Sequence, residues 1–163
     1  MIEMAITEQM KEIARVKAEE MGKLYNSITR GDGNVAGFLG EAMVAKYTGA
    51  VMANTYDYDL LHLDYIRIDV KTKRTDVVPK PFYECSVADF NTKQNCDWYV
   101  FTRVTNTLSK GWILGFMPKK DFYTHSRFCR KGDIDLANNF VFKADCYNIS
   151  IEKLYPLPNI FPS

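Results

Sequence analysis

Two short segments carry the residue types that can hold a divalent metal ion against a phosphate group. The first contains Asp59, and the second alternates Ile68 and Val70 with Asp69 and Lys71. Residues two apart in a β-strand share a face, so the second aspartate and the lysine are predicted to stand side by side while the two apolar residues enter the core. Carboxylate oxygens suit a hard cation such as Mg²⁺, and a lysine ammonium suits a phosphate. The pattern therefore predicts phosphodiester hydrolysis.

The acid-x-lysine tripeptide is a weak signal by itself, because a chain with 20 acidic residues is expected to contain roughly one or two by chance. Its context is more specific. Asp59 lies about one hairpin upstream, and a helix rich in small residues carries Glu41 before it. A second interpretation is a solvated strand face of alternating charge, with ion pairs across neighbouring strands. That interpretation explains Asp69 and Lys71 but not the order of the other two acids.

The candidate catalytic residues are Glu41, Asp59, Asp69 and Lys71. The two aspartates would supply hard oxygen ligands to a metal ion, and the backbone carbonyl of Val70 would add a third. Glu41 would ligate a second metal ion or orient the attacking water. Lys71 could contact the scissile phosphate or, in its neutral form, help to deprotonate that water. The sequence leaves both choices open.

Hydrophobic periodicity places these residues on predicted elements. Gly37 and Gly40 make one side of the second helix small, which predicts its close approach to the sheet. Asn34 is the candidate N-cap of that helix, and Gly49 is its candidate stop. Helices are predicted over residues 7–26, 35–48 and 118–122. Strands are predicted over residues 50–54, 56–61, 65–73, 98–104, 111–117, 140–143 and 147–151, and residues 82–94 are ambiguous between a strand and a helical turn or two.

Composition bounds the class of protein. A chain of 163 residues, 47% of them hydrophobic and 25% charged, is typical of one globular domain. No apolar run is long enough to span a membrane, and the first residues lack the basic-then-apolar pattern of a secretory signal. A cytoplasmic protein is therefore expected, in the host-cell cytoplasm if the chain is viral. Four scattered cysteines and two histidines argue against a zinc site and for reduced thiols. A net charge of +1 does not by itself indicate nucleic-acid binding, so any such binding would depend on local basic patches.

The order of the candidate residues resembles the PD-(D/E)XK nuclease superfamily, which places an acid on the first core helix, an aspartate on one central strand and acid-x-lysine on the next. The matching residues here are Gly40-Glu41, Tyr58-Asp59 and Asp69-Val70-Lys71. The resemblance covers residues 34–104. It implies an α/β fold with a restriction-endonuclease-like αβββαβ core, in which helices flank a mixed central sheet. The expected single domain then has an N-terminal helix in 1–30, the core in 34–117 and a C-terminal extension in 118–163.

Two departures from the family pattern concern the site. Tyr58 stands where the proline of the family name belongs, and Asp57 has the same strand parity as Asp59. Asp57 is therefore an alternative metal ligand. Asp59 is preferred because Leu60 and Leu61 continue the strand after it, as is usual in the family.

The resemblance implies a Mg²⁺-dependent DNA endonuclease, with Mn²⁺ able to substitute, of the restriction, repair, junction-resolving or phage type. The residues expected to contact nucleic acid are Lys73, Arg74, Lys93 and Gln94, with basic residues after 118 as further candidates. No sequence-reading module is visible, and the small size leaves a homodimer open. The alternative is a non-catalytic nucleic-acid-binding module on the same fold. The sequence does not distinguish DNA from RNA.

Overall fold

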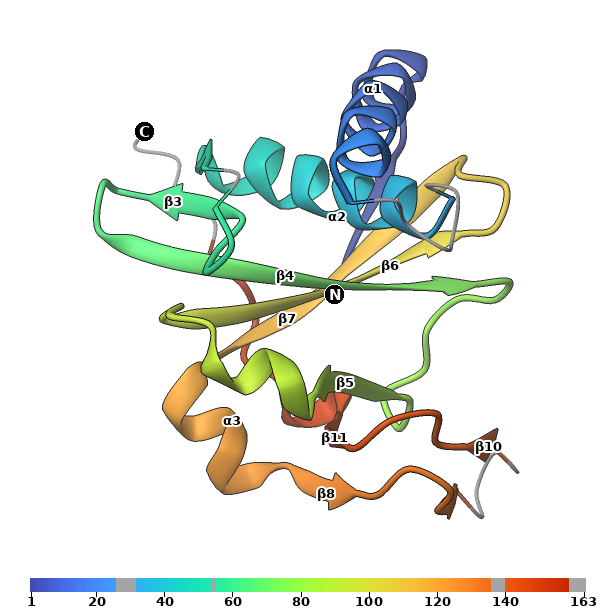
Figure 1. Cartoon of the computed structure of the whole chain (residues 1–163), viewed down its shortest axis with the longest axis vertical. Coiled ribbons are helices and arrows are strands. Elements are labelled where there is room, and N and C mark those ends of the chain that lie inside the picture. The colour runs from blue at the N-terminus through green and yellow to red at the C-terminus, as the bar shows by residue number, and fades with distance from the viewer. Residues whose placement is uncertain (26–31, 54, 136–139, 159–163) are drawn as a thin grey trace.

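A mixed six-stranded sheet forms the centre of the computed structural model, which describes residues 1–25, 32–53, 55–135 and 140–158 (Figure 1). Its strands, in order across the sheet, are β1 (Ile2–Ala5), β7 (Lys110–Pro118), β6 (Trp98–Thr105), β4 (Ile66–Thr75), β3 (Leu60–His62) and β2 (Val51–Met52). β4 and β6 run parallel, whereas the other neighbouring strands pair antiparallel. A parallel pair needs a long crossover, and here the crossover carries the chain through a second layer.

Two helices cover one face of this sheet, α2 (Asp32–Thr48) directly and α1 (Glu8–Tyr25) across α2 (Figure 1). A Cβ atom at Gly40 would collide with the hydroxyl of Thr72 and come within 2.5 Å of the hydroxyl of Thr102. Glycine at this position therefore allows α2 to lie directly on β4 and β6. α2 is followed by Gly49, whose φ of +72° is the left-handed conformation common just after a helix. The close contact fixes the position of Glu41, the residue after Gly40.

The ten residues of β4 divide between two faces. Ile68 and Val70 pack with Leu39 of α2 on the helix-covered face. Asp69 and Lys71 alternate with them and point to the opposite face. That face carries a second apolar cluster, built largely on β6 and β7. The alternation predicted from the sequence for this strand is therefore present.

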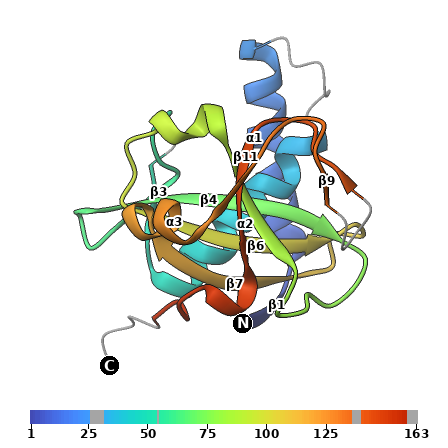
Figure 2. The same cartoon turned by 90° about the horizontal axis from the view of Figure 1, so that it is seen from below.

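A second, three-stranded sheet lies over that opposite face, in the order β5 (Glu84–Ala88), β11 (Cys146–Ser150) and β8 (Arg127–Cys129). Figure 2 shows β5 and β11 running across the strands of the larger sheet. The polar face of β4, which the alternative interpretation took to be solvated, is thus an interior face. The other elements of this layer are α3 (Lys119–His125), the 3₁₀ helices η1 (Asp89–Lys93) and η2 (Ile151–Lys153), and the hairpin of β9 (Ile134–Asp135) and β10 (Phe140–Val141).

The long predicted elements are present, and their ends differ by a few residues. The helices predicted at 7–26 and 35–48 correspond to α1 and α2, although α2 already includes Asn34, which is therefore not its N-cap. The strand predicted at 56–61 is shorter than expected, because β3 begins only at Leu60 and leaves Asp59 just before it. Residues 26 and 54, at the predicted ends of two elements, lie outside the described residues.

Two parts of the predicted core are built differently. The connection between β4 and β6 was expected to hold a core helix, but it contains β5 and only the five-residue 3₁₀ helix η1. The reason is a period-two pattern in which Cys85 and Val87 are buried between half-buried neighbours, as suits a strand. The predicted extension 118–163 supplies β8 and β11, so its described part forms the second layer. β1, which pairs with β7, was not predicted.

No helix in the described ranges is long and apolar enough to span a membrane. All four cysteines are buried and free, in agreement with the prediction of reduced thiols. Burial raises the pKa of Cys85 and of Cys96 to about 11, so both thiols stay protonated at neutral pH and are poor nucleophiles.

Candidate active site

The candidate site lies at the N-terminal end of β3, beyond the last residue pair that β3 forms with β4. The register of the two strands ends at Leu60 opposite Ile68. Val70, the next residue of β4 that faces this side, has no partner on β3, and its N–H donates to Asp59 Oδ2 at 2.7 Å instead. The N–H and C=O of one strand residue point to the same side, so the carbonyl of Val70 also faces the end of β3. A carboxylate and a backbone carbonyl therefore meet at this point.

Asp69 is the most buried of the predicted site residues, with 2% of its surface exposed. Its Oδ2 atom lies 2.7 Å from Lys71 Nζ. The ammonium approaches outside hydrogen-bond geometry, and among the described residues this oxygen accepts no hydrogen bond. A buried carboxylate oxygen is costly when it lacks a hydrogen-bond partner. Asp69 Oδ2 is therefore an available ligand.

The carboxyl of Asp59 is held in an unfavourable environment for a negative charge. Burial raises its pKa to about 8, and the charges of Glu41 and Asp69 act in the same direction. The hydrogen bond from the N–H of Val70 opposes the shift. Like charges this close disfavour joint ionisation unless a cation joins them. The site therefore holds either a proton or a positive ion.

Glu41 reaches the same site from α2, where it is 8% exposed. Burial, helped by the nearby charge of Asp69, raises its pKa to about 7, although Lys17 and Lys71 act to lower it. Glu41 thus interacts electrostatically with residues on both β4 and α1. The structure brings all four predicted catalytic residues together, from α2, the start of β3 and β4.

Lys71 is held between two polar groups. Besides the ion pair with Asp69, its Nζ donates to Gln94 Oε1 at 3.3 Å. The side-chain amide of Gln94 donates in turn to the carbonyl of Tyr56 at 2.8 Å, and its backbone carbonyl accepts a hydrogen bond from Lys119. These bonds hold the ammonium group in place. Only 19% of the Lys71 side chain is exposed. Gln94 therefore positions Lys71.

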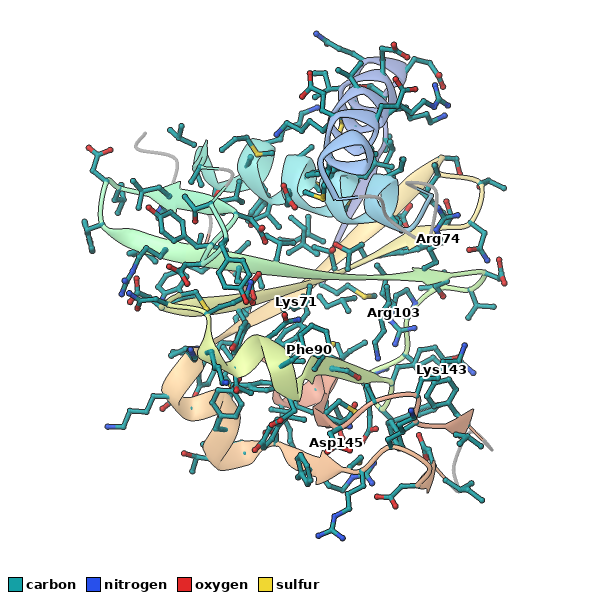
Figure 3. All side chains as sticks on the ribbon, viewed as in Figure 1. Lys71, Arg74, Phe90, Arg103, Lys143 and Asp145 are labelled. Atoms are coloured by element: carbon teal, nitrogen blue, oxygen red, sulfur yellow. The ribbon has the colours of Figure 1, made fainter. Side chains whose placement is uncertain are left out.

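The other predicted residues are more dispersed. Lys73 shares the face of Lys71, whereas Arg74 lies on the helix-covered side of β4, so the two do not form one patch (Figure 3). Lys93 is exposed on η1. Asp57 accepts a hydrogen bond from the N–H of Asn95 at 3.1 Å. That bond ties two loops together, and the geometry favours Asp59 over Asp57 as the ligand.

Three basic residues near the site were not singled out from the sequence. Arg103 and Lys143 line a cavity that begins at Lys71, and Lys17 interacts with Glu41. The register of β6 on β4, which pairs Lys73 with Arg103, places Arg103 on the same face as Lys71, and the sequence alone does not give this register. The other two positions depend on how α1 and the C-terminal segment pack, which no local pattern shows.

The residues present fit a hard cation with a mixed donor set. Within the described residues, no three His, Cys, Asp or Glu side chains are arranged as a ready metal site. The available donors are instead the carboxylates of Asp59 and Asp69 and the carbonyl of Val70. Oxygen donors of this kind suit Mg²⁺ or Mn²⁺. Asp69 Oδ2 has the Lys71 ammonium beside it but accepts no hydrogen bond from the described residues, and burial raises the pKa of Asp59, so both carboxyl groups would gain from a bound cation.

The raised pKa values predict that the metal-free protein loses stability as the pH rises. Asp59 and Glu41 have pKa values of about 8 and about 7 in the folded protein, against ordinary values of 3.8 and 4.5. The folded state then binds more protons than the unfolded chain between about pH 4 and pH 8, so the free energy of unfolding falls across that window.

Urea unfolding in EDTA, at about pH 5 and about pH 8, measures this effect. Asp59→Asn should flatten the pH dependence, because the amide does not titrate. Wild-type and variant curves of equal slope would contradict the assignment.

Comparisons with known proteins do not identify the chain. No family model matches it, and no curated protein matches its sequence. Its function is therefore argued from the geometry around Asp59, Asp69 and Lys71.

Proposed function

We propose that this chain is a metal-dependent phosphodiesterase that cleaves nucleic acid, most readily DNA, on a restriction-endonuclease-like core. The observation that carries the proposal is the convergence of Glu41, Asp59, Asp69 and Lys71 on one partly buried site. The order of elements supports it as well. α2 is followed by the antiparallel strands β2, β3 and β4, and then by β6 parallel to β4. The short helix η1 stands where such a core has a longer one.

Asp59, Asp69 and the carbonyl of Val70 would hold Mg²⁺, and Mn²⁺ could replace it. The bound ion would polarise a phosphoryl oxygen and ease ionisation of the attacking water. Glu41 has a pKa near neutrality and lies on the α2 side of the same site. Its carboxylate is suited to accept the proton that the attacking water releases.

Lys71 binds the scissile phosphate in this proposal. An ammonium carries three N–H donors, and Asp69 and Gln94 occupy at most two of them. The third can donate to a phosphate oxygen, where the positive charge stabilises the charge that develops as the bond breaks. Because Lys71 is held before substrate arrives, little reorganisation is needed.

A cleavage assay tests the proposal. The substrates are supercoiled plasmid, linear duplex, single strand, branched junction and RNA, each with Mg²⁺, Mn²⁺ or EDTA. We expect cleavage only with metal, and a metal-dependent rise in melting temperature. Asp69→Asn should lose both, whereas Asp64→Asn, the same change on the exposed β3–β4 turn, should lose neither. A folded protein that cuts none of these substrates would instead be the non-catalytic binding module.

A further inference from the structure

A cavity of about 750 Å³ lies between the larger sheet and the second layer. It begins at Lys71 and extends along β4 and β6 past Arg103 to Lys143 (Figure 3). Its volume is in the range of pockets that bind ligands of roughly drug or nucleotide size. The candidate active site therefore opens into a channel that is already formed.

Two cations of this cavity, Lys73 and Arg103, share one backbone carbonyl as their acceptor. Lys73 Nζ and a terminal guanidinium nitrogen of Arg103 both donate to the carbonyl of Glu84, at 3.2 and 3.1 Å. The carboxylate of Glu84 is turned away to Arg127, also at 3.1 Å. In the part of the chain that the structure describes, neither Lys73 nor Arg103 forms an ion pair. The pair therefore places two positive charges side by side, with backbone and hydroxyl oxygens as their hydrogen-bond acceptors.

Arg103 retains an unused donor in this position. Its Nε atom is buried and, within the described residues, donates no hydrogen bond. Its guanidinium lies over the ring of Tyr83, 5.2 Å from the ring centre. Burial lowers the pKa of Arg103, and burial together with the charge of Arg103 lowers the pKa of Lys73, although Glu84 acts to raise it. A phosphate accepts donors from both residues at once.

The spacing along β4 suggests which phosphates are bound. Lys71 and Lys73 are two residues apart on one strand face, about 6.6 Å along the strand. This separation is close to that of adjacent phosphates along one nucleotide chain. One phosphate can therefore lie at Lys71 while the next lies at Lys73 and Arg103.

Building on the proposed function, we infer that the cavity binds the substrate as a single strand, with the scissile phosphate at Lys71 and the neighbouring one at Lys73 and Arg103. The cavity of about 750 Å³ has the volume of a site for a drug- or nucleotide-sized ligand. It therefore has room for a short piece of one strand and not for a duplex. The aromatic rings of Tyr83 and Phe140 line the same cavity and offer surfaces on which bases stack without sequence preference.

Binding in EDTA tests the inference without cleavage. The probes are a short fluorescent oligodeoxyuridylate, an oligouridylate of the same length and a blunt DNA duplex, and binding is followed by fluorescence anisotropy. We expect the single strands to bind more tightly than the duplex. Lys73→Gln and Arg103→Gln should each weaken single-strand binding about tenfold or more, and flatten its salt dependence by about 0.7 per lost phosphate contact. The single strand that binds more tightly shows whether the site prefers deoxyribose or ribose.

Lys46→Gln is the matched control, because Lys46 is exposed on α2, on the other face of the sheet. It makes the same charge change and should leave binding unchanged. Tyr83→Leu keeps every charge, and should weaken binding while preserving the salt dependence. Circular dichroism and melting temperature confirm folding of each variant. If a charge variant unfolds, two measurements still test the inference. They are the binding of single strands by Tyr83→Leu, and the comparison of single strands with the duplex in the wild-type protein.

Two results would overturn the inference: a duplex that binds as tightly as the single strands, or folded charge variants that bind as the wild type does. These outcomes are separate from failure of the proposed function. Single-strand binding that depends on Lys73 and Arg103, without any metal-dependent cleavage, would refute the nuclease and keep the binding site. Metal-dependent cleavage at the wild-type rate in the Lys73 and Arg103 variants would keep the nuclease and refute the binding site.

Discussion

Lys71→Ala is expected to slow metal-dependent cleavage by about a hundredfold to a thousandfold or more. The ammonium is fixed by Asp69 and Gln94, and it is the cation nearest to the proposed metal ligands. Its loss removes the contact that would stabilise charge on the phosphate. It also leaves Asp69 buried without its ion-pair partner, so the variant should be less stable than the wild type.

The measurement is a single-turnover cleavage rate, at a temperature where circular dichroism shows the variant to be folded. Lys46→Ala serves as the control, since this lysine is exposed on α2. Oligonucleotide binding in EDTA should fall far less than the rate, because Lys73 and Arg103 remain. A folded Lys71→Ala protein that cuts at the wild-type rate would show that the site has been assigned wrongly.

Val70→Asp is expected to prevent folding. Val70 is 7% exposed and belongs to the core shared with Leu39 and Met43 of α2. An unpaired carboxylate at this position costs several kcal/mol, which is comparable with the whole stability of a typical domain, about 5–15 kcal/mol. The change tests strand register, because the flanking residues Asp69 and Lys71 tolerate charge.

Val51→Asp is the matched control, since Val51 on β2 is 66% exposed. That variant should unfold in urea close to the wild-type midpoint. Circular dichroism and urea titration of the two variants provide the comparison. A cooperative, native-like transition for Val70→Asp would mean that residue 70 does not face the helices.

The sequence was sufficient for features that depend on neighbours along the chain. Alternation along β4 assigned Val70 to the core and Lys71 to the other face, and the small side of α2 predicted its close approach at Gly40. The same alternation also separates Arg74 from Lys73, although the sequence interpretation grouped them as one basic patch. That grouping followed adjacency in the chain and ignored strand parity.

Other features depend on partners distant in sequence, and no local pattern could reveal them. The sequence indicated that the face of Asp69 is polar, but it did not indicate what covers that face. It is covered because β5 pairs with β11, where Ser86 and Asn148 lie 62 residues apart. For the same reason, the sequence could not show that Lys143 lines the same cavity as Lys71. The sequence selected four candidate residues that interact with one another in the structure, whereas it did not indicate their enclosure.

The pairing of β5 with β11 also has a consequence for how the chain folds. The residues of α1, α2 and the six central strands are all synthesised before residue 119, whereas β5 must wait for β11 near the other end. Closing so long a loop is entropically slow, and contacts distant in sequence slow folding generally. We therefore expect an intermediate on the ribosome in which the central sheet is formed and Val87, Tyr99 and Phe101 are still uncovered. Such a species is prone to aggregation, so the expressed protein should depend on chaperones and on low temperature during synthesis.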